Sequence, residues 1–200
     1  MPVAFADLAQ TCAPIIAAET LAGVVSLESR FEPYAIRINS GPSLTEQPKS
    51  RVEAIQIATS LAAEGLDIQL GLGGIGMEEL RKLNLSITDA FDPCVNLQAT
   101  ATLLNGYYRL ALEAGADGKQ AEQVMLQSWY GRADPSVGEM VRYDEQIREE
   151  IERLGPTLAT LTIGVGSQGS ELQAGTLKEA KNRDTASAPL WDVFKSRRQS

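Results

Sequence analysis

Apolar residues recur at helical spacing along most of this chain, which predicts a mainly helical fold. Between residues 20 and 29, Leu21, Val24 and Val25 follow this spacing and predict a buried helix. Further helices are predicted on both sides of it. The long ones run between Ser50 and Gly65, between Asp92 and Gly115, from Lys119 to Tyr130 and from Val137 to Leu154, and the short ones from Ala6 to Gln10 and from Glu78 to Leu83.

Two of these helices carry recognisable start signals. Ser50-Arg-Val-Glu53 has the form of a capping box, in which Ser50 is the N-cap and Glu53 reaches back to the Ser50 N–H. Asp92-Pro93 places a proline in the first turn of the next long helix, where its missing N–H costs nothing. We therefore expect these two helices to begin at these positions.

One segment alternates instead of following helical spacing. Asp67-Ile-Gln-Leu-Gly71 predicts a short strand that leads into the glycine-rich stretch Gly71-Leu-Gly-Gly-Ile-Gly76. The sequence thus predicts an α+β fold, predominantly helical with a small β element. We expect one domain over residues 1–155 and a flexible tail over residues 156–200.

Composition narrows the chemistry. The chain has no histidine, the commonest general base and metal ligand, and its two cysteines, Cys12 and Cys94, are too few for a thiolate metal site. No cofactor or metal is expected, so the chemistry must depend on carboxylates or on binding alone. The net charge is −8, and residues 1–155 carry 12 Lys/Arg against 22 Asp/Glu. An acidic body argues against nucleic acid as a partner, because phosphates call for clustered basic residues.

Glu28 is the carboxylate with the clearest reason to be chemically unusual. It closes an apolar helical run, and the partial negative charge of a helix C-terminus disfavours its ionised form. Leu27 and Phe31 beside it predict desolvation, which acts in the same direction. From the residues alone, an ordinary polar residue at a helix end remains the alternative. A nucleotide loop is the alternative at residues 71–76, but that stretch lacks a Gly-Lys-Ser/Thr ending.

Three segments, taken in order, resemble a known family. Glu28-Ser-Arg-Phe-Glu-Pro-Tyr-Ala-Ile36, the glycine-rich stretch 71–76 and Ser128-Trp-Tyr-Gly131 resemble the catalytic domain of lytic transglycosylases with a goose-type lysozyme fold. Within that group the chain looks most like the wall-cutting proteins of type IV secretion and conjugal transfer systems. The resemblance implies a lysozyme-like fold with a β element near residues 36–40 and 67–71, and Glu28 at the wall of a cleft.

The resemblance also implies a reaction and a set of site residues. A single acid, Glu28, protonates the leaving oxygen of the bond between N-acetylmuramic acid and N-acetylglucosamine, and a 1,6-anhydro ring closes in the product. Tyr130 is expected to bring its hydroxyl near this acid, and Tyr143 is a weaker candidate for the cleft. Trp129 is expected in the core, with stacking on a sugar face as the alternative. The residues expected to contact glycan are Ser29, Tyr34, Leu72, Gly73, Gly74 and Tyr130.

The chain departs from the family at two positions. Gly74 and Gly76 stand where relatives carry Gln and Asn, so two side chains expected to bind substrate or steady the acid are absent. A non-catalytic wall-binding or assembly module of the same apparatus therefore remains an alternative. A cytosolic helical adaptor is a third reading.

The resemblance finally implies partners and a compartment. Peptidoglycan glycan strands and components of a type IV secretion system are the expected partners, and a Cys12–Cys94 disulfide is expected in an oxidising periplasm. The first residues show no secretory signal, so a signal upstream, another export route and a cytosolic chain all stay open. No apolar run approaches the ~20 residues of a membrane span, so none is expected.

Overall fold

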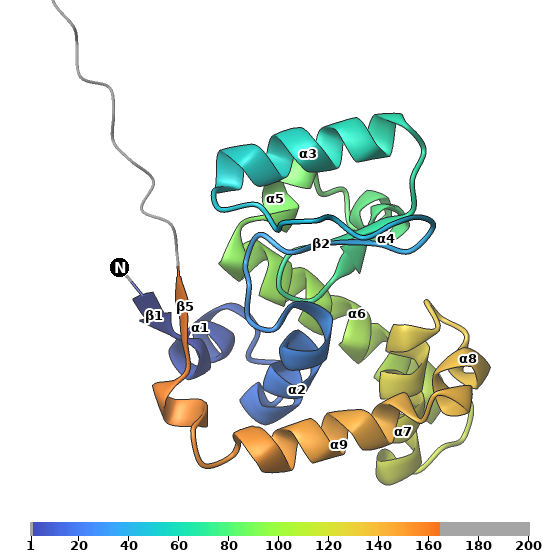
Figure 1. Cartoon of the computed structure of the whole chain (residues 1–200). Helices are drawn as coiled ribbons and strands as arrows, with labels where there is room; N and C mark the ends of the chain where they lie inside the picture. Colours follow the sequence, from blue (N-terminus) through green and yellow to red (C-terminus); the bar gives the residue numbers. More distant parts are fainter. Residues whose placement is uncertain (1, 165–200) are drawn as a thin grey trace, which may run out of the picture. The chain divides into compact units, whose positions relative to one another are not determined.

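The computed structural model describes residues 2–164, and helices dominate this part of the chain (Figure 1). The predicted α+β, predominantly helical fold is confirmed. The longer helices are α2 (Ala18–Ser29), α3 (Arg51–Ala63), α6 (Pro93–Glu113), α7 (Gly118–Tyr130) and α9 (Tyr143–Leu154). The shorter ones are α1 (Phe5–Cys12), α4 (Met77–Lys82), α5 (Ile87–Ala90), α8 (Pro135–Met140) and the 3-10 turn η1 (Leu158–Thr160). None of the helices between residues 2 and 164 is long and apolar enough to cross a membrane.

The strands form two small antiparallel sheets. The strands β2 (Ile36–Ile38), β3 (Ile68–Leu70) and β4 (Ile75–Gly76) pair in the order β2-β3-β4, close to the β element expected from the sequence. The register places Arg37 opposite Gln69, and Gln69 opposite Gly76. The sheet thus brings the loop after α2 beside the glycine-rich stretch.

The second sheet is one that the sequence pattern does not predict. The strand β1 (Pro2–Ala4) pairs with β5 (Thr162–Gly164), and such short strands leave too little alternation to recognise. Both β5 and η1 lie inside the segment expected to be a tail, so the packed part of the chain extends past residue 155 to Gly164. The remainder of the expected tail, residues 165–200, lies outside the described residues.

The helix α2 is the central element of the core. Its residues from Thr20 to Ser26 are all buried, which is typical of a helix that is surrounded by other elements. The helix α9 packs closely against it, because a Cβ on Gly23 would lie 3.0 Å from Ile147 Cγ2. In Figure 1, α9 runs along α2, while α3 lies on the other side of the molecule beside the β2–β4 sheet.

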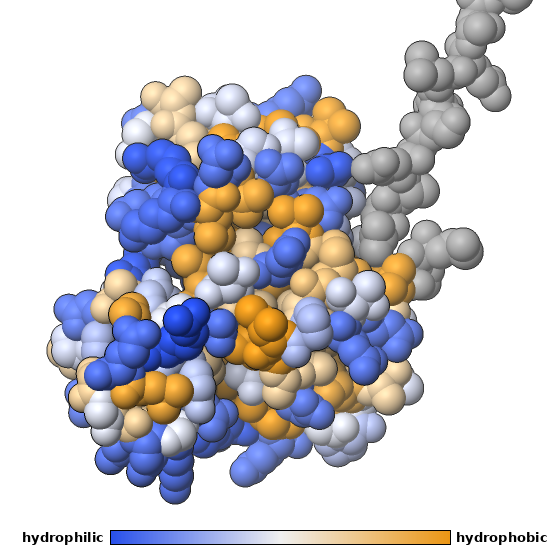
Figure 2. All heavy atoms as spheres, turned by 180° about the vertical axis from the view of Figure 1, so that it is seen from behind, coloured by the Kyte–Doolittle hydropathy of each residue, from blue (hydrophilic) through white to orange (hydrophobic). Residues whose placement is uncertain are grey.

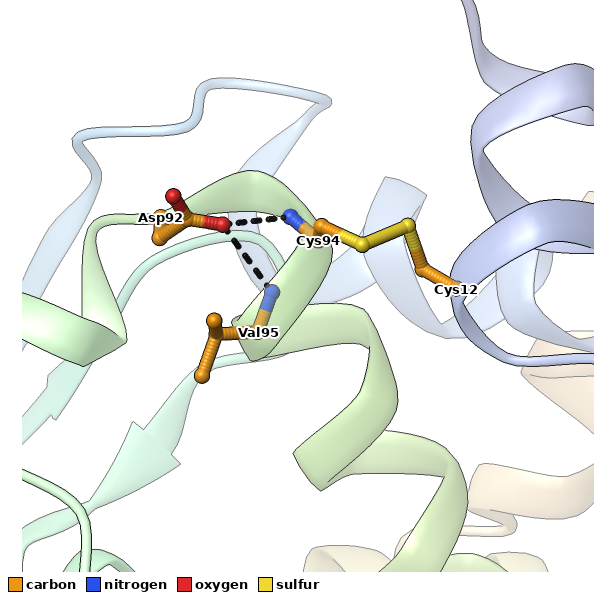
Figure 3. The surroundings of a disulfide bond; sticks show 4 residues. All are labelled: Cys12, Asp92, Cys94 and Val95. Atoms are coloured by element: carbon orange, nitrogen blue, oxygen red, sulfur yellow. Dashed lines mark hydrogen bonds between the residues drawn. A yellow bond between two sulfur atoms is a disulfide. The ribbon is translucent and has the colours of Figure 1, made fainter.

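The predicted helix starts are present, with one difference in detail. Ser50 accepts the N–H of Glu53 at 3.2 Å, but the Glu53 carboxylate accepts the N–H of Lys49 at 2.8 Å and does not reach back to Ser50. Asp92 caps α6 by accepting the N–H groups of Cys94 and Val95 (Figure 3). The α6 start is thus fixed by Asp92 in the way that the sequence indicates.

The predicted helix from Val137 to Leu154 is wrong as one element. The structure divides it into α8 and α9, because Arg142 adopts a left-handed conformation with φ 53°. Helical spacing on both sides of the break hides it, since neither a proline nor a glycine stands at residue 142. The break turns α9 so that Tyr143, at its first position, points into the molecule and is only 3% exposed.

A disulfide joins Cys12, at the end of α1, to Cys94, in the first turn of α6 (Figure 3). The two Cα atoms are 5.3 Å apart, although the cysteines are 82 residues apart in sequence. The bond therefore ties the N-terminal helix to the helix that passes through the core.

Figure 2 shows one face of the molecule, on which apolar residues gather around the middle among more hydrophilic residues. The groove described next lies between the end of α2 and the β2–β4 sheet.

Candidate functional site

An open groove with a volume of about 1450 Å³ follows the end of α2. Its walls are the last turn of α2, the loop that follows, β2, part of the glycine-rich stretch and the segment around β5. Arg30 and Phe31 both have positive φ, 54° and 65°, so the chain reverses sharply directly after Ser29. Such strained backbone is concentrated at functional sites. Phe31 is anchored by an edge-on contact with the buried Phe5, with ring centroids 5.2 Å apart.

Glu28 lies at the inner wall of this groove, in the last turn of α2. Its side chain is only 3% exposed. Tyr143 donates its hydroxyl to Glu28 Oε1 at 2.6 Å, and Arg37 forms an ion pair with Oε2. Both carboxyl oxygens are therefore held in fixed positions by other parts of the fold.

Burial raises the pKa of Glu28 above its usual value, because removal of water disfavours the charged form. The charge of Arg37 and the hydrogen bonds from Tyr143, Arg37 and Trp129 lower this pKa, but burial outweighs them. The result is the shift that a proton donor requires. Its cause is desolvation, one of the two causes that the sequence predicts at this position.

Tyr143 supplies the hydroxyl beside the acid, in place of Tyr130, the residue expected for that role. Tyr130 is 42% exposed and lies against Tyr143, with ring centroids 5.1 Å apart. Burial raises the pKa of Tyr143 well above its usual value, and the charge of Glu28 acts the same way, so this hydroxyl keeps its proton and donates. Trp129 is 9% exposed and belongs to the core, the position that the sequence predicts for it.

Arg37 is a site residue that sequence reasoning missed. It lies on β2 and donates its Nε–H to Gln69 Oε1 at 2.7 Å, across the β2–β3 pair. Its only signal in the sequence is a cation nine residues after Glu28, which carries no information without the strand register. The sheet is therefore what directs this guanidinium onto the acid.

The glycine-rich stretch lines the groove only in part. Gly71 and Gly74 are at its wall, whereas Leu72 is fully buried in the core, away from the position expected for a glycan contact. Gly73 is also behind the wall, since its N–H is donated to Asn96 Oδ1 at 2.8 Å. A Cβ on Gly73 would lie 2.0 Å from Thr100 Oγ1, so α6 packs directly against this residue.

Asn96 holds the stretch in place and is a second residue whose role the sequence does not reveal. It is 1% exposed, and its amide nitrogen donates to the carbonyls of Leu70 and Ala90 at 3.1 and 2.8 Å. With the bond from Gly73, its side-chain amide is satisfied by the backbone of β3, of α5 and of the glycine-rich stretch. Asn96 thus fixes the turn against α6 without touching the groove.

The two glycines that depart from the family pattern leave space that carboxylates fill. A Cβ on Gly74 would lie 2.9 Å from Glu28 Oε2, and one on Gly76 would lie 2.4 Å from Glu79 Oε2. Gly74 also has φ 66°, a conformation that favours glycine. Glu79 is only 7% exposed. The space at these two positions is therefore taken by carboxylates, that of Glu28 at Gly74 and that of Glu79 at Gly76.

The other expected contact residues have different surroundings. Tyr34 is half-buried at the groove. Ser29 is 6% exposed and donates its hydroxyl back to the Val25 carbonyl at 3.1 Å, so it steadies the helix end. Between residues 2 and 164, no group of three or more Cys, Asp or Glu side chains is arranged to hold a metal ion.

Comparison with known proteins gives a consistent group of relatives. The chain is 43% identical over 110 residues to the type IV secretion system protein virB1 of Brucella suis, which is 55% of this chain and 46% of that protein. It is 30% identical over 164 residues to protein virB1 of Agrobacterium fabrum, covering 78% of this chain and 64% of the relative. Protein virB1 of Rhizobium radiobacter is 32% identical over 123 residues, which is 61% of this chain and 48% of the relative.

The chain thus spans about half the length of the Brucella relative, and somewhat more of the Agrobacterium one. No protein-family model matches the chain, and no solved structure matches it. The virB1 relatives agree with the resemblance to type IV secretion proteins that the three sequence segments indicate.

Proposed function

We propose that this chain, a homologue of the virB1 proteins of type IV secretion systems, is a peptidoglycan lytic transglycosylase. The observation that carries the proposal is the Glu28 carboxyl, which is buried at the wall of an open groove, held by Tyr143 and raised in pKa. A protonated acid in this position contributes about 10²–10⁴ in rate to the cleavage of a glycosidic bond.

The proposed reaction uses one acid in two roles. Glu28 gives its proton to the glycosidic oxygen, the bond from that oxygen to C1 of N-acetylmuramic acid breaks, and N-acetylglucosamine leaves with the proton. The N-acetyl group of the substrate stabilises the developing positive charge. The Glu28 carboxylate then takes the proton of the muramyl 6-hydroxyl, whose oxygen bonds to C1 and closes the 1,6-anhydro ring.

The second carboxylate of an ordinary glycosidase is not needed in this scheme. Glu32, four residues after Glu28, is exposed at the groove, and no hydrogen bond joins it to Glu28. Tyr143 keeps the Glu28 carboxyl in one orientation through both proton transfers. The protein residues therefore do little more than hold and move one proton.

The proposed setting is the cell envelope. Local cutting of the wall in the periplasm would admit the type IV secretion apparatus. The partners would be glycan strands and components of the secretion system. The names of the relatives support a role in type IV secretion, and the disulfide is compatible with an oxidising compartment.

Incubation of the purified protein with murein sacculi tests the proposal. Wild type is expected to release muropeptides, and Glu28→Gln is expected to lose release by at least 10²-fold while it still binds sacculi. Glu32→Gln tests for a second carboxylate, because Glu32 also lines the groove. Glu64→Gln is the matched control, and it keeps cleavage because Glu64 is exposed at the end of α3 and does not line the groove.

Sacculi that bind wild type but stay intact would contradict the proposal and favour a wall-binding module. Neither binding nor release would favour the adaptor. Equal loss of release in Glu28→Gln and Glu32→Gln would contradict the single-acid scheme.

A further inference from the structure

Arg37 covers the side of Glu28 that faces the groove. Its side chain is 43% exposed, whereas that of Glu28 is 3% exposed. The ion pair is therefore open to solvent from the guanidinium side only. Gln69 accepts the Nε–H of Arg37 and orients the guanidinium toward Glu28.

The contacts with Arg37 and Tyr143 favour the carboxylate over the carboxylic acid, although burial acts in the opposite direction. Oε1 already accepts the hydroxyl of Tyr143, and Oε2 already accepts an N–H of Arg37. A proton on Oε2 would weaken the hydrogen bond from Arg37, because a neutral oxygen is a poorer acceptor for a guanidinium that keeps its own protons. Arg37 also lies between the buried carboxyl and solvent, so we expect a glycosidic oxygen in the groove to reach Oε2 only after Arg37 has moved.

The charged and titratable groups near Glu28 are few. Arg37 approaches from β2 and Tyr143 from α9, while Tyr130 of α7 reaches it through Tyr143. Gly74, on the remaining side, brings no charge. Arg37 is thus the one cation among these neighbours, and of the side chains that bond Glu28 directly it is the exposed one.

We propose that Arg37 is a positioning residue that caps ionised Glu28 in the free protein and is displaced when a glycan strand enters the groove. The inference rests on the proposed function and adds a step to it: the strand that is to be cut also exposes the acid. Displacement removes a nearby positive charge and so raises the pKa of Glu28 further, which favours uptake of its proton in the complex. An empty groove then holds a protected carboxylate.

Titration of Glu28 by carboxyl-carbon NMR tests the cap without any need for activity. Arg37→Gln is expected to raise the pKa of Glu28 in the free protein, because it removes the charge and the hydrogen bond of Arg37, which both lower it. Arg37→Lys keeps the charge, so the pKa of Glu28 in this variant is expected to be closer to its wild-type value. Lys82→Gln is the control variant, and it is expected to leave the pKa of Glu28 unchanged. It also removes the cation of an ion pair, but this pair, Lys82 with Glu78 at 3.0 Å, lies on the surface of α4.

An oligosaccharide of N-acetylglucosamine is the probe for displacement. It is expected to raise the pKa of Glu28 in wild type toward the value of Arg37→Gln, and to increase solvent exchange of the Arg37 Nε–H. In the pH profile of kcat/KM on solubilised murein, the alkaline limb of Arg37→Gln is expected at higher pH than that of wild type.

An unchanged Glu28 titration in Arg37→Gln would overturn the cap. So would bound oligosaccharide that leaves the Glu28 titration and the Arg37 Nε–H exchange as they were. If wild type titrates as expected and responds to the oligosaccharide but cuts no murein, the proposed function fails and the cap stands. Thermal unfolding of each variant checks that the fold is kept.

Discussion

Glu28 is placed where it weakens the fold. Burial of a carboxyl disfavours its charge, and the charge of Arg37 and the three hydrogen-bond donors compensate only in part, so the pKa stays above its ordinary value of 4.5. The residue that the proposed chemistry needs is therefore one that a more stable protein would replace. Such a trade between stability and activity is common at active sites.

Replacement of this carboxyl is expected to stabilise the protein in a pH-dependent way. Because the pKa is higher in the folded than in the unfolded state, wild type loses stability as the pH rises from about 4.5 through the folded-state pKa, and no more above it. Glu28→Gln has no such loss. Urea unfolding at a series of pH values should show the advantage of the variant growing across this window. An advantage that shrinks with rising pH would contradict the assigned shift.

Gly74 is expected to tolerate no side chain. Its φ of 66° costs an L-residue about 1–2 kcal/mol, and a Cβ would press on Glu28 Oε2. Gly74→Ala should therefore lower the free energy of unfolding by at least about 1–2 kcal/mol and reduce cleavage of murein. Gly106→Ala is the control: nothing lies within 4 Å of its added Cβ in α6, and alanine favours helix by up to about 1 kcal/mol. Equal stability of the two variants would refute the argument.

At the scale of single residues, the sequence indicates Glu28 but not the residues that contact its carboxyl. Glu28 can be recognised because its helix, its apolar surroundings and its family motif are all local. Tyr143 lies 115 residues away and Arg37 acts through a strand register, so neither contact has a local signal. Tyr130 and Tyr143 are both tyrosines near the end or start of a helix, and only the packing of α7 on α9 distinguishes them.

Among the elements, α1 and α6 are joined most firmly. The Cys12–Cys94 bond closes a loop with a sequence separation of 82, which the chain-entropy view values at about 4–5 kcal/mol. The double variant Cys12→Ser/Cys94→Ser should lose a stabilisation of this order, measured by urea unfolding. Reductant should lower the melting temperature of wild type toward that of the variant and leave the variant unchanged. Two freely titrating thiols in the native protein would contradict the bond.

Helix starts are the elements that the sequence predicts best. Asp92-Pro93 and Ser50 act through hydrogen bonds to residues two or three positions on, so the sequence contains the whole signal. The break between α8 and α9 depends on a left-handed arginine, and the β1–β5 pair joins the two ends of the described chain. Both are decided by packing, and neither leaves a pattern that local rules can read.

At the scale of the molecule, the site is made by the meeting of distant segments. The end of α2 supplies the acid, β2 the guanidinium and α9 the hydroxyl, while Asn96 of α6 fixes the glycine turn opposite them. The helical content and the position of the acid follow from the sequence. The enclosure of Glu28 on three sides cannot be predicted from the sequence, because it forms only once the sheet, α6 and α9 have packed together.

The chemical identity of the cut ends tests the central claim most directly. Wild type is incubated with murein sacculi in water enriched in heavy oxygen, and the released muropeptides are analysed by mass spectrometry. The account predicts muramyl ends that are one water lighter than hydrolysed ends and carry no heavy oxygen, since the muramyl 6-hydroxyl and not water closes the reaction. Muramyl ends that contain the heavy isotope would show hydrolysis and would contradict it.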